Sequence, residues 1–321
     1  MCSVVFHCCL VFSLSPAHIC ITMTNVSELG VTTFTMASFS GMESLNSVYF
    51  CLFFFLYIVI IVENTSLIGL IVLQKSLHEP MYLLVCNLAA NGLYGSTALL
   101  PAMLKHILSR SHQVTLSSCL LQVFTVHTYA IVEFTILAAM SYDRYVAICR
   151  PLHYHTAMPL SKVYKIITLT WLLPFVRLYC LNYSLVRLSC SDTGYMNIVG
   201  IVSVFLYTVP QIVLIFYTYG HILKICVFSS RESQSKALRT CTPHLLTLVN
   251  YAIGCFFEIA QSRFELSHLT FESRSFMSLY FLIFPPILNP AIYGMTCLQN
   301  MNWSYHVYCC FFPSLNYDGR M

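Results

Sequence analysis

The chain reads Met140-Ser141-Tyr142-Asp143-Arg144-Tyr145-Val146-Ala147-Ile148-Cys149 at the end of a long apolar run, and Arg150-Pro151 follows directly. An acid and a base inside a bilayer have no water to hydrate them, so Asp143 and Arg144 are expected where a buried helix emerges at the membrane surface. An ordinary charged helix end would satisfy the same condition. The ten-residue phrase is far longer than a chance dipeptide, however, and we interpret it as a functional motif.

The composition of the chain indicates a membrane protein with several spans before any motif is considered. Of the 321 residues, 58% are hydrophobic and 9% are charged, and the mean hydropathy is +0.73. A soluble domain carries about 25% charged residues, so this chain cannot cover a surface that faces water. The net charge of +4 is too small to indicate a nucleic-acid partner. No CxxC pair or HExxH motif predicts a metal or redox site.

Four stretches, in order along the chain, resemble the motifs of olfactory receptors, a branch of the rhodopsin-like G-protein-coupled receptors. The phrase quoted above is similar to the motif at the inner end of that family's third helix, and the others are residues 77–82 (LHEPMY), 236–245 (KALRTCTPHL) and 285–294 (PPILNPAIYG). The resemblance covers about residues 40 to 296, and the wording around Asn87 and Asn91 is more similar to fish-type members. It implies an all-α fold, a bundle of seven transmembrane helices.

The resemblance and the apolar runs together predict three regions: an extracellular tail (1–46), a seven-helix domain (47–296) and a cytoplasmic tail (297–321). A spanning helix needs about 20 apolar residues. We expect helices over about residues 47–73, 80–104, 119–144, 163–176, 198–222, 237–260 and 276–295.

Two parts of the chain depart from the family pattern. Arg177 interrupts the fourth apolar run after about 14 residues, which is short for a spanning helix. We interpret it as a truncated helix in which about twenty residues of the family pattern are missing between Phe175 and Val176, a figure judged from the spanning length. The tail after Gly294 lacks the family's basic helix and instead contains an aromatic, cysteine-bearing stretch at residues 303–312.

The distribution of basic residues predicts the orientation in the membrane. Lys and Arg are more frequent in the loops after the first, third and fifth expected helices, which places those loops in the cytosol and the N-terminus outside. We therefore expect a multi-pass protein of the plasma membrane with outward-facing glycosylation sequons at Asn25 and Asn182. The resemblance implies a disulfide between Cys119 and Cys180, on the oxidising outer side.

The resemblance also implies a switch at the cytosolic end of the bundle. In the family, Arg144 pairs with Asp143 at rest and contacts the G protein in the active state, when two tyrosines move toward it. An Asn-Pro pair loosens the seventh helix, because proline removes a backbone hydrogen bond and permits a kink. A passive kink is the alternative, and the Asn-Pro-x-x-Tyr context favours the switch. The implied switch residues are Asp143, Arg144, Tyr145, Tyr219, Asn289, Pro290 and Tyr293.

A small-molecule pocket is expected between the outer halves of the third, fifth, sixth and seventh helices. Such sites are mostly apolar with a few polar groups. Core packing explains each candidate wall residue at least as well when it is taken singly, and His127 is the best individual candidate. The candidates are His127, Ala130, Ile131, Ser203, Tyr207, Cys255, Phe256, Ile259 and Leu279.

An acidic residue in the third helix, Glu133, matches a carboxylate that olfactory receptors add to the sodium site of rhodopsin-like receptors. Where those receptors usually have an aspartate, this chain has Gly92, preceded by Asn91. Glu133 is therefore either part of a cation site or a neutral acid that is hydrogen-bonded between helices.

The predicted function is an odorant-type receptor that binds a small molecule and activates a heterotrimeric stimulatory G protein, with membrane lipid as its other partner. No nucleophile, base and orienting group are grouped in the sequence, so we expect neither an enzyme nor a cofactor or metal. A transporter or channel would fit the intramembrane acids, but no internal repeat is present. A degenerate, non-signalling member of the receptor family is the other alternative, because losing half a helix exposes backbone groups to lipid.

Overall fold

The structure is a computed structural model that describes residues 33–35, 46–108, 113–185, 194–263 and 271–301. Within these ranges the chain forms seven long helices. They are α4 (Asn46–Leu73), α5 (Pro80–Leu108), α6 (Leu116–Cys149), α8 (Leu160–Leu185), α9 (Gly194–Phe228), α10 (Arg231–Arg263) and α11 (Phe271–Met301). The fold is therefore all-α, as the sequence predicts, and its long helices number seven among the residues described.

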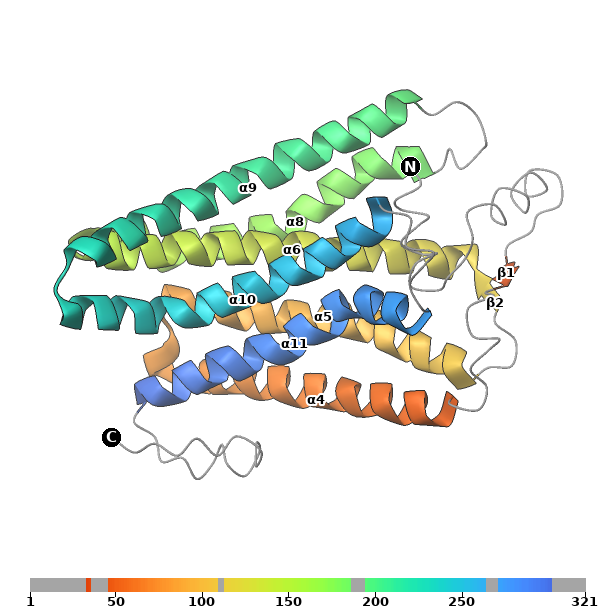
Figure 1. The fold of residues 1–321 in the computed structure, drawn as a ribbon, viewed down its shortest axis with the longest axis horizontal. Coiled ribbons are helices and arrows are strands. Elements are labelled where there is room, and N and C mark those ends of the chain that lie inside the picture. Colours follow the sequence, from red (N-terminus) through yellow and green to blue (C-terminus); the bar gives the residue numbers. More distant parts are fainter. Residues whose placement is uncertain (1–32, 36–45, 109–112, 186–193, 264–270, 302–321) are drawn as a thin grey trace.

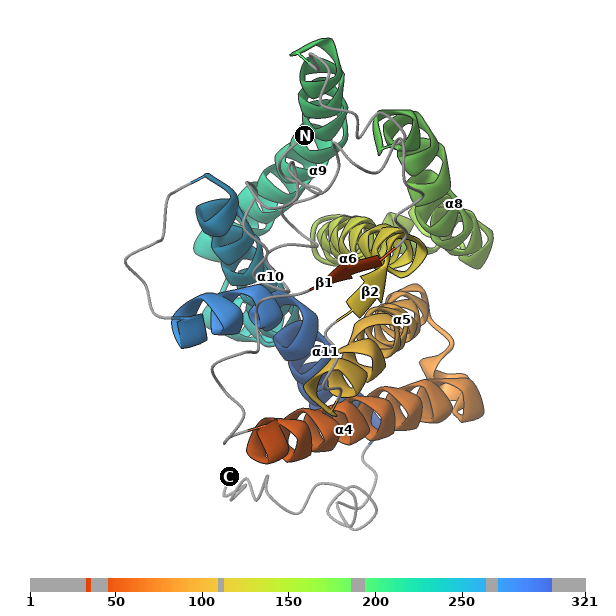
Figure 2. The ribbon, with the colours of Figure 1, turned by 90° about the vertical axis from the view of Figure 1, so that its right-hand side faces the viewer.

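The helices lie side by side along the long axis of the molecule (Figure 1). Figure 2 shows α6 near the middle of the bundle, and α6 packs against α5, α8, α9 and α10. The other helices close a ring in which α4 contacts α5, and α11 contacts α4, α5 and α10. α6 therefore presents side chains to most of the other helices.

Short elements connect the helices at the two ends of the bundle. At one end lie the turn η1 (Lys75–Leu77), the turn η2 (Pro151–His153) and the one-turn helix α7 (Tyr154–Ala157). At the other end, strand β1 (Thr33–Thr35) pairs antiparallel with β2 (Gln113–Thr115), so that Thr33 lies opposite Thr115. This pairing fastens a segment before α4 to the segment that leads into α6 (Figure 1).

The core follows the 3.6-residue periodicity of α6. Val132, Ile136, Leu137 and Met140 recur on one helical face and are all at most 1% exposed, where they pack in one cluster with residues of α5 such as Leu88. Large apolar side chains on the outer faces are instead exposed, among them Phe205, Leu206, Val213 and Phe216 of α9. Exposure of this kind on a long apolar helix fits a surface that faces lipid rather than water.

Five of the long helices, within the described residues, are long and apolar enough to cross a bilayer: α4, α5, Phe124–Cys149 of α6, Phe205–Phe228 of α9 and Leu279–Cys297 of α11. α8 and α10 lie in the same bundle, although their composition does not meet that criterion. α10 begins with charged and polar residues, and α8 contains Arg177. The chain is a multi-pass membrane protein.

The structure corrects two expectations about helix ends. α8 does not stop at Arg177 but continues without interruption from Leu160 to Leu185, 26 residues in all. The apolar run was a poor guide to its length, because an arginine keeps its backbone N–H and carbonyl in the helical hydrogen bonds whatever the polarity of its side chain. Pro174 removes one such bond, and the helix nevertheless continues past it. The Asp-Arg-Tyr triplet is likewise not at the helix end: α6 continues past Arg144 to Cys149.

Candidate functional site

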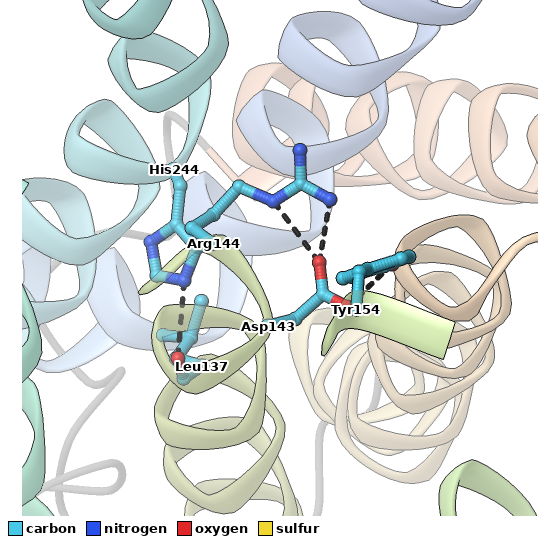
Figure 3. A network of polar contacts seen from close by, with 5 residues as sticks. All are labelled: Leu137, Asp143, Arg144, Tyr154 and His244. Atoms are coloured by element: carbon cyan, nitrogen blue, oxygen red, sulfur yellow. Dashed lines mark hydrogen bonds and ion pairs between the residues drawn. The ribbon is translucent and has the colours of Figure 1, made fainter. Parts of the chain in front are cut away.

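The charged pair near the C-terminal end of α6 forms a closed contact. The Arg144 guanidinium donates to Asp143 Oδ2 from Nε at 3.1 Å and from Nη2 at 2.5 Å (Figure 3). Asp143 is 0% exposed and the Arg144 side chain is 14% exposed. Breaking such a pair would leave a buried charge without compensation, which is strongly unfavourable. The pair therefore holds Arg144 beside its own helix.

Tyr154, which lies outside α6, forms a further hydrogen bond with the Asp143 carboxylate. Its hydroxyl donates to Asp143 Oδ1 at 2.9 Å, so both oxygens of the carboxylate are occupied. Burial, together with the negative charge of Asp143, raises the pKa of the Tyr154 phenol, which keeps the hydroxyl protonated and able to donate. Tyr154 lies in α7, directly after η2, so the loop between α6 and α8 is tied to the charged pair.

His244 of α10 forms the contact between α10 and α6 at the same level (Figure 3). The imidazole is 0% exposed, and its Nε2 lies 3.1 Å from the Leu137 carbonyl oxygen. A carbonyl only accepts, so Nε2 must carry the hydrogen that it donates. The ring of Tyr219 from α9 meets the His244 ring edge-on, with centroids 5.8 Å apart. Three helices therefore meet around this histidine.

Of the three predicted switch tyrosines, Tyr219 packs against the His244 ring and Tyr293 is linked to His244 through Thr247. The hydroxyls of Tyr293 and Thr247 are 3.0 Å apart, and the Thr247 hydroxyl also donates to the His244 carbonyl at 2.8 Å. Tyr219 OH is buried and has no hydrogen-bond partner among the described residues. Tyr145, the third member of the triplet, is buried and its ring packs at 5.9 Å from that of Tyr217. Neither Tyr219 nor Tyr293 hydrogen-bonds Arg144 here.

A second polar centre lies deeper in the bundle, around Glu133. Its two carboxyl oxygens accept hydrogen bonds from Asn91 Nδ2 at 2.8 Å and from Asn289 Nδ2 at 2.7 Å. Glu133 is 1% exposed, and Asn91 also donates to the Tyr129 carbonyl at 3.1 Å. The acid thus joins α5, α6 and α11. This geometry accounts for the hydrogen-bonded role of Glu133, and cation binding there stays a prediction.

Asn64 of α4 compensates the proline in α11. Pro290 has no N–H, so the carbonyl four residues earlier, that of Pro286, has no helical donor. Asn64 Nδ2 donates to the Pro286 oxygen at 2.8 Å and to Ile60 O, also at 2.8 Å. Asn64 is 1% exposed, so water does not substitute for it. A side chain from another helix therefore satisfies the carbonyl that the Asn289-Pro290 pair frees.

The predicted pocket residues lie in the half of the bundle away from Arg144. Ala130 and Ile131 of α6 offer their carbonyls to Tyr251 at 3.2 Å and to Tyr207 at 2.8 Å. The Tyr207 hydroxyl also hydrogen-bonds Thr135. His127, Cys255 and Leu279 are partly buried in the same region. Below them lies an aromatic layer in which Tyr129, Phe134, Tyr251 and Phe281 pack with centroids 5.4–5.5 Å apart.

The prediction that Phe256 lines the pocket is wrong. The Phe256 side chain is 63% exposed on the outer face of α10, where its ring packs against that of Phe257. Cys255, one position earlier, takes the inward direction, because neighbouring positions on a helix differ by about 100°. The side chains of Ser203, Ile259, Cys119, Cys180 and Asn182, and the whole of Asn25, lie outside the described residues. The pairing, glycosylation and binding roles predicted for them stay predictions.

Two residues of this site were not predicted as site residues from the sequence. His244 lies within the motif at residues 236–245, and Tyr154 lies in the stretch after Arg150. Both positions were visible, but their partners, Leu137 and Asp143, are 107 and 11 residues away. For His244, the available signal in the sequence was its place within that motif.

Comparisons with known proteins agree with this architecture. The olfactory receptor family matches residues 50–178 and 173–309. Human (Homo sapiens) olfactory receptor 52K1 is 31% identical over 86% of this chain and 95% of its own length, and olfactory receptor 52K2 is 32% identical over the same shares. The crystal structure of squid rhodopsin superimposes with a TM-score of 0.67 at 18% identity, covering 85% of this chain and 89% of that one. That likeness establishes the fold.

The residues covered by the family match bear on the two atypical regions, the fourth helix near Arg177 and the tail after Gly294. The match consists of two segments that overlap at residues 173–178, which is where the sequence predicts missing family residues. At the C-terminal side the match extends to residue 309, beyond the limit near residue 296 that the motifs predicted. The fish-type likeness of the wording around Asn91 stays a prediction.

Proposed function

The chain belongs to the olfactory receptor family, whose members are receptors rather than enzymes, and from this premise we propose that it binds a small odorant within the bundle and activates a heterotrimeric stimulatory G protein. The proposal places it in the plasma membrane with the N-terminus outside. The end of the bundle that carries Arg144 then faces the cytosol. Positive charge supports this orientation, because Arg150, Lys162, Lys165 and Lys224 lie at that end.

The observation that carries the proposal is the buried contact between Arg144 and Asp143. A G protein can use the Arg144 side chain only after that side chain leaves Asp143, so the contact separates a resting arrangement from an active one. Tyr154 stabilises the resting arrangement through its bond to Asp143. Opening exposes Arg144 between α6, α9 and α10, where the free hydroxyl of Tyr219 supplies a new partner.

The ligand would bind in the outer half, on the aromatic layer. Ile131, Tyr207 and Leu279 form its inward-facing walls on α6, α9 and α11, and His127 and Cys255 add polar atoms. A ligand there would press on Tyr251 and Phe281, whose rings lie 5.4 Å apart. Because Tyr251 belongs to α10, the layer links occupancy of the pocket to the helix that holds His244. We propose a small, mostly apolar ligand for these walls.

The test is a cyclic AMP assay in cells that carry the receptor at the surface, with a panel of small volatile molecules. We expect at least one ligand to raise cyclic AMP, and the Arg144→Gln variant at equal surface level to lose the response. A Phe256→Ala variant is the matched control, because its outward side chain should leave the response unchanged.

The same experiment decides against the proposal in two cases. A receptor that folds and reaches the surface but never responds favours the degenerate alternative, which the division of the family match into two segments overlapping at residues 173–178 also motivates. A response that persists without Arg144, or an ion current independent of G protein, contradicts the signalling role.

A further inference from the structure

Three cysteines from three different helices gather at the same end of the bundle as Arg144. Cys226 of α9 is 8% exposed and Cys241 of α10 is 2% exposed, and both belong to one packed cluster with Tyr145, Val146 and Ile222. Cys149, the last residue of α6, packs against that cluster and is partly exposed. We call Cys149, Cys226 and Cys241 the thiol cluster. The function proposed above uses none of them.

The ends of α6 and α9 that carry Cys149 and Cys226 pack against each other, since the Tyr145 ring of α6 lies 5.8 Å from the His221 ring of α9 and Val146 and Ile222 share one cluster. None of the three is in a disulfide. The side chains that pack with the three thiols in this cluster are mostly apolar or aromatic. Thiols facing the cytosol stay reduced under ordinary conditions, and a bond between them would form only under oxidation.

We propose that the thiol cluster is an oxidative modification site, in which a peroxide converts Cys149 and Cys226 into a disulfide that joins α6 to α9. Cys149 reacts first, because it is the partly exposed member and a peroxide reaches it from the cytosol. Its sulfur attacks one peroxide oxygen, the O–O bond breaks, and Cys149 becomes a sulfenic acid while the peroxide is reduced to water or an alcohol.

The second step uses the buried thiol. Cys226 attacks the sulfenic sulfur, the S–O bond breaks, the S–S bond forms, and the hydroxyl leaves as water with the proton of the Cys226 thiol. A nearby second thiol that resolves a sulfenic acid is the usual arrangement of redox-sensing cysteines. One peroxide is consumed for each disulfide, and reduction by a cytosolic thiol such as glutathione would reverse it.

A bond between Cys149 and Cys226 would hold the inner ends of α6 and α9 in the arrangement described here. Tyr219 is two turns from Cys226 on α9, and Arg144 lies five residues before Cys149 on α6. The disulfide would therefore restrain the two helices between which Arg144 must be exposed. This consequence rests on the proposed signalling function, whereas formation of the bond does not.

The test treats the full-length receptor in membranes with hydrogen peroxide and maps cysteine-containing peptides by mass spectrometry without reduction. We expect a peptide pair linked through Cys149 and Cys226, and its loss on treatment with dithiothreitol. In the Cys226→Ala variant the linked pair should disappear, and a dimedone adduct should accumulate on Cys149 instead. Cys297→Ala, which removes a buried thiol of α11 outside the cluster, should leave the pair unchanged.

Several outcomes would overturn the proposal. These are absence of the link in wild-type protein, a link from Cys149 to Cys241 in place of Cys226, or oxidation of Cys149 no faster than that of the exposed Cys51 on α4. The wild-type result stands even where a variant misfolds. A mapped link that leaves ligand-independent cyclic AMP unchanged would refute only the restraint, and the modification site would remain.

Discussion

At the scale of single residues, Gly95 of α5 leaves no room for a side chain beside Tyr129 of α6. A Cβ added at Gly95 would lie 2.5 Å from Tyr129 Cδ2 and 2.7 Å from Cγ, atoms near the base of the ring. Tyr129 cannot move aside easily, because it is 1% exposed and its hydroxyl donates to the Phe281 carbonyl at 3.3 Å. Glycine therefore lets α5 and α6 approach each other at the level of the aromatic layer.

Gly95→Ala should destabilise the folded receptor by about 1–3 kcal/mol, the usual cost of overpacking a well-packed core. Gly69→Ala is the matched control, since nothing lies within 4 Å of a Cβ there and alanine in a helix gains about 0.5–1 kcal/mol over glycine. Thermal unfolding of the purified receptor in detergent measures both. Equal effects of the two substitutions would show that the contact between Gly95 and Tyr129 is not tight.

The sequence identified the residues whose function depends on a local motif. Asp143, Arg144 and the Asn289-Pro290 pair were predicted in this way. It did not identify partners that tertiary packing supplies, such as Tyr154 for Asp143, or His244 for the Leu137 carbonyl. Phe256 was assigned inward because helical position alone does not fix which face of α10 meets the bundle. Motifs specify chemistry, and the packing of helices selects which side chains meet.

At the scale of elements, the kink-permitting proline of α11 depends on α4. Pro290 has no N–H with which to donate a hydrogen bond to the Pro286 carbonyl. Asn64 Nδ2 donates that bond instead, at 2.8 Å from the Pro286 oxygen. The donor that replaces the missing N–H therefore comes from a different helix, α4. The consequence is that the flexibility of α11 is set by a hydrogen bond from another helix rather than by proline alone.

A double-mutant cycle tests this dependence. Asn64→Leu should cost about 1–2 kcal/mol, since a buried carbonyl loses its donor. In a Pro290→Ala background the same change should cost less, because the alanine N–H can bond the Pro286 carbonyl. Thr65→Val, at the exposed neighbouring position, is the control and should have little effect. Strictly additive melting shifts for Asn64→Leu and Pro290→Ala would contradict the assignment of Asn64 as the substitute donor.

Two helices are longer in the structure than the hydropathy of the sequence predicted. α10 begins at Arg231, six residues before the predicted start, and α9 ends at Phe228, six residues after the predicted end. The missed residues of α10, 231–236, are polar or charged, so hydropathy does not detect them. The missed residues of α9, 223–228, are apolar apart from Lys224, so there it was the charge of Lys224 that led to too early an end. The same reasoning failed at Arg177, where a charged residue lies inside α8 rather than at its end.

At the scale of the whole molecule, the bundle has one end that carries the charged pair, the thiol cluster and the turn between α9 and α10 (Figure 1). The opposite end carries the β1–β2 pairing. The distribution of lysine and arginine predicts that the first end is cytosolic. All of the signalling account depends on this polarity.

An epitope tag at the N-terminus should stain on intact cells, whereas a tag inserted between Ser229 and Ser230 should stain only after permeabilisation. The reason is that the turn after α9 lies at the end of the bundle that carries Arg144. Immunofluorescence with and without detergent measures both, and a cytosolic protein stained in parallel controls for membrane integrity. Staining of the Ser229–Ser230 tag on intact cells would reverse the orientation.

The most direct test of the account is ligand-independent cyclic AMP in cells that carry equal surface amounts of wild type, Asp143→Asn, Arg144→Gln and the double variant. If the buried contact between Asp143 and Arg144 maintains the resting state, Asp143→Asn should raise the basal signal several-fold, and Arg144→Gln should abolish that rise in the double variant. A basal signal that stays at the wild-type level in Asp143→Asn, or a rise that survives the loss of Arg144, would contradict the account.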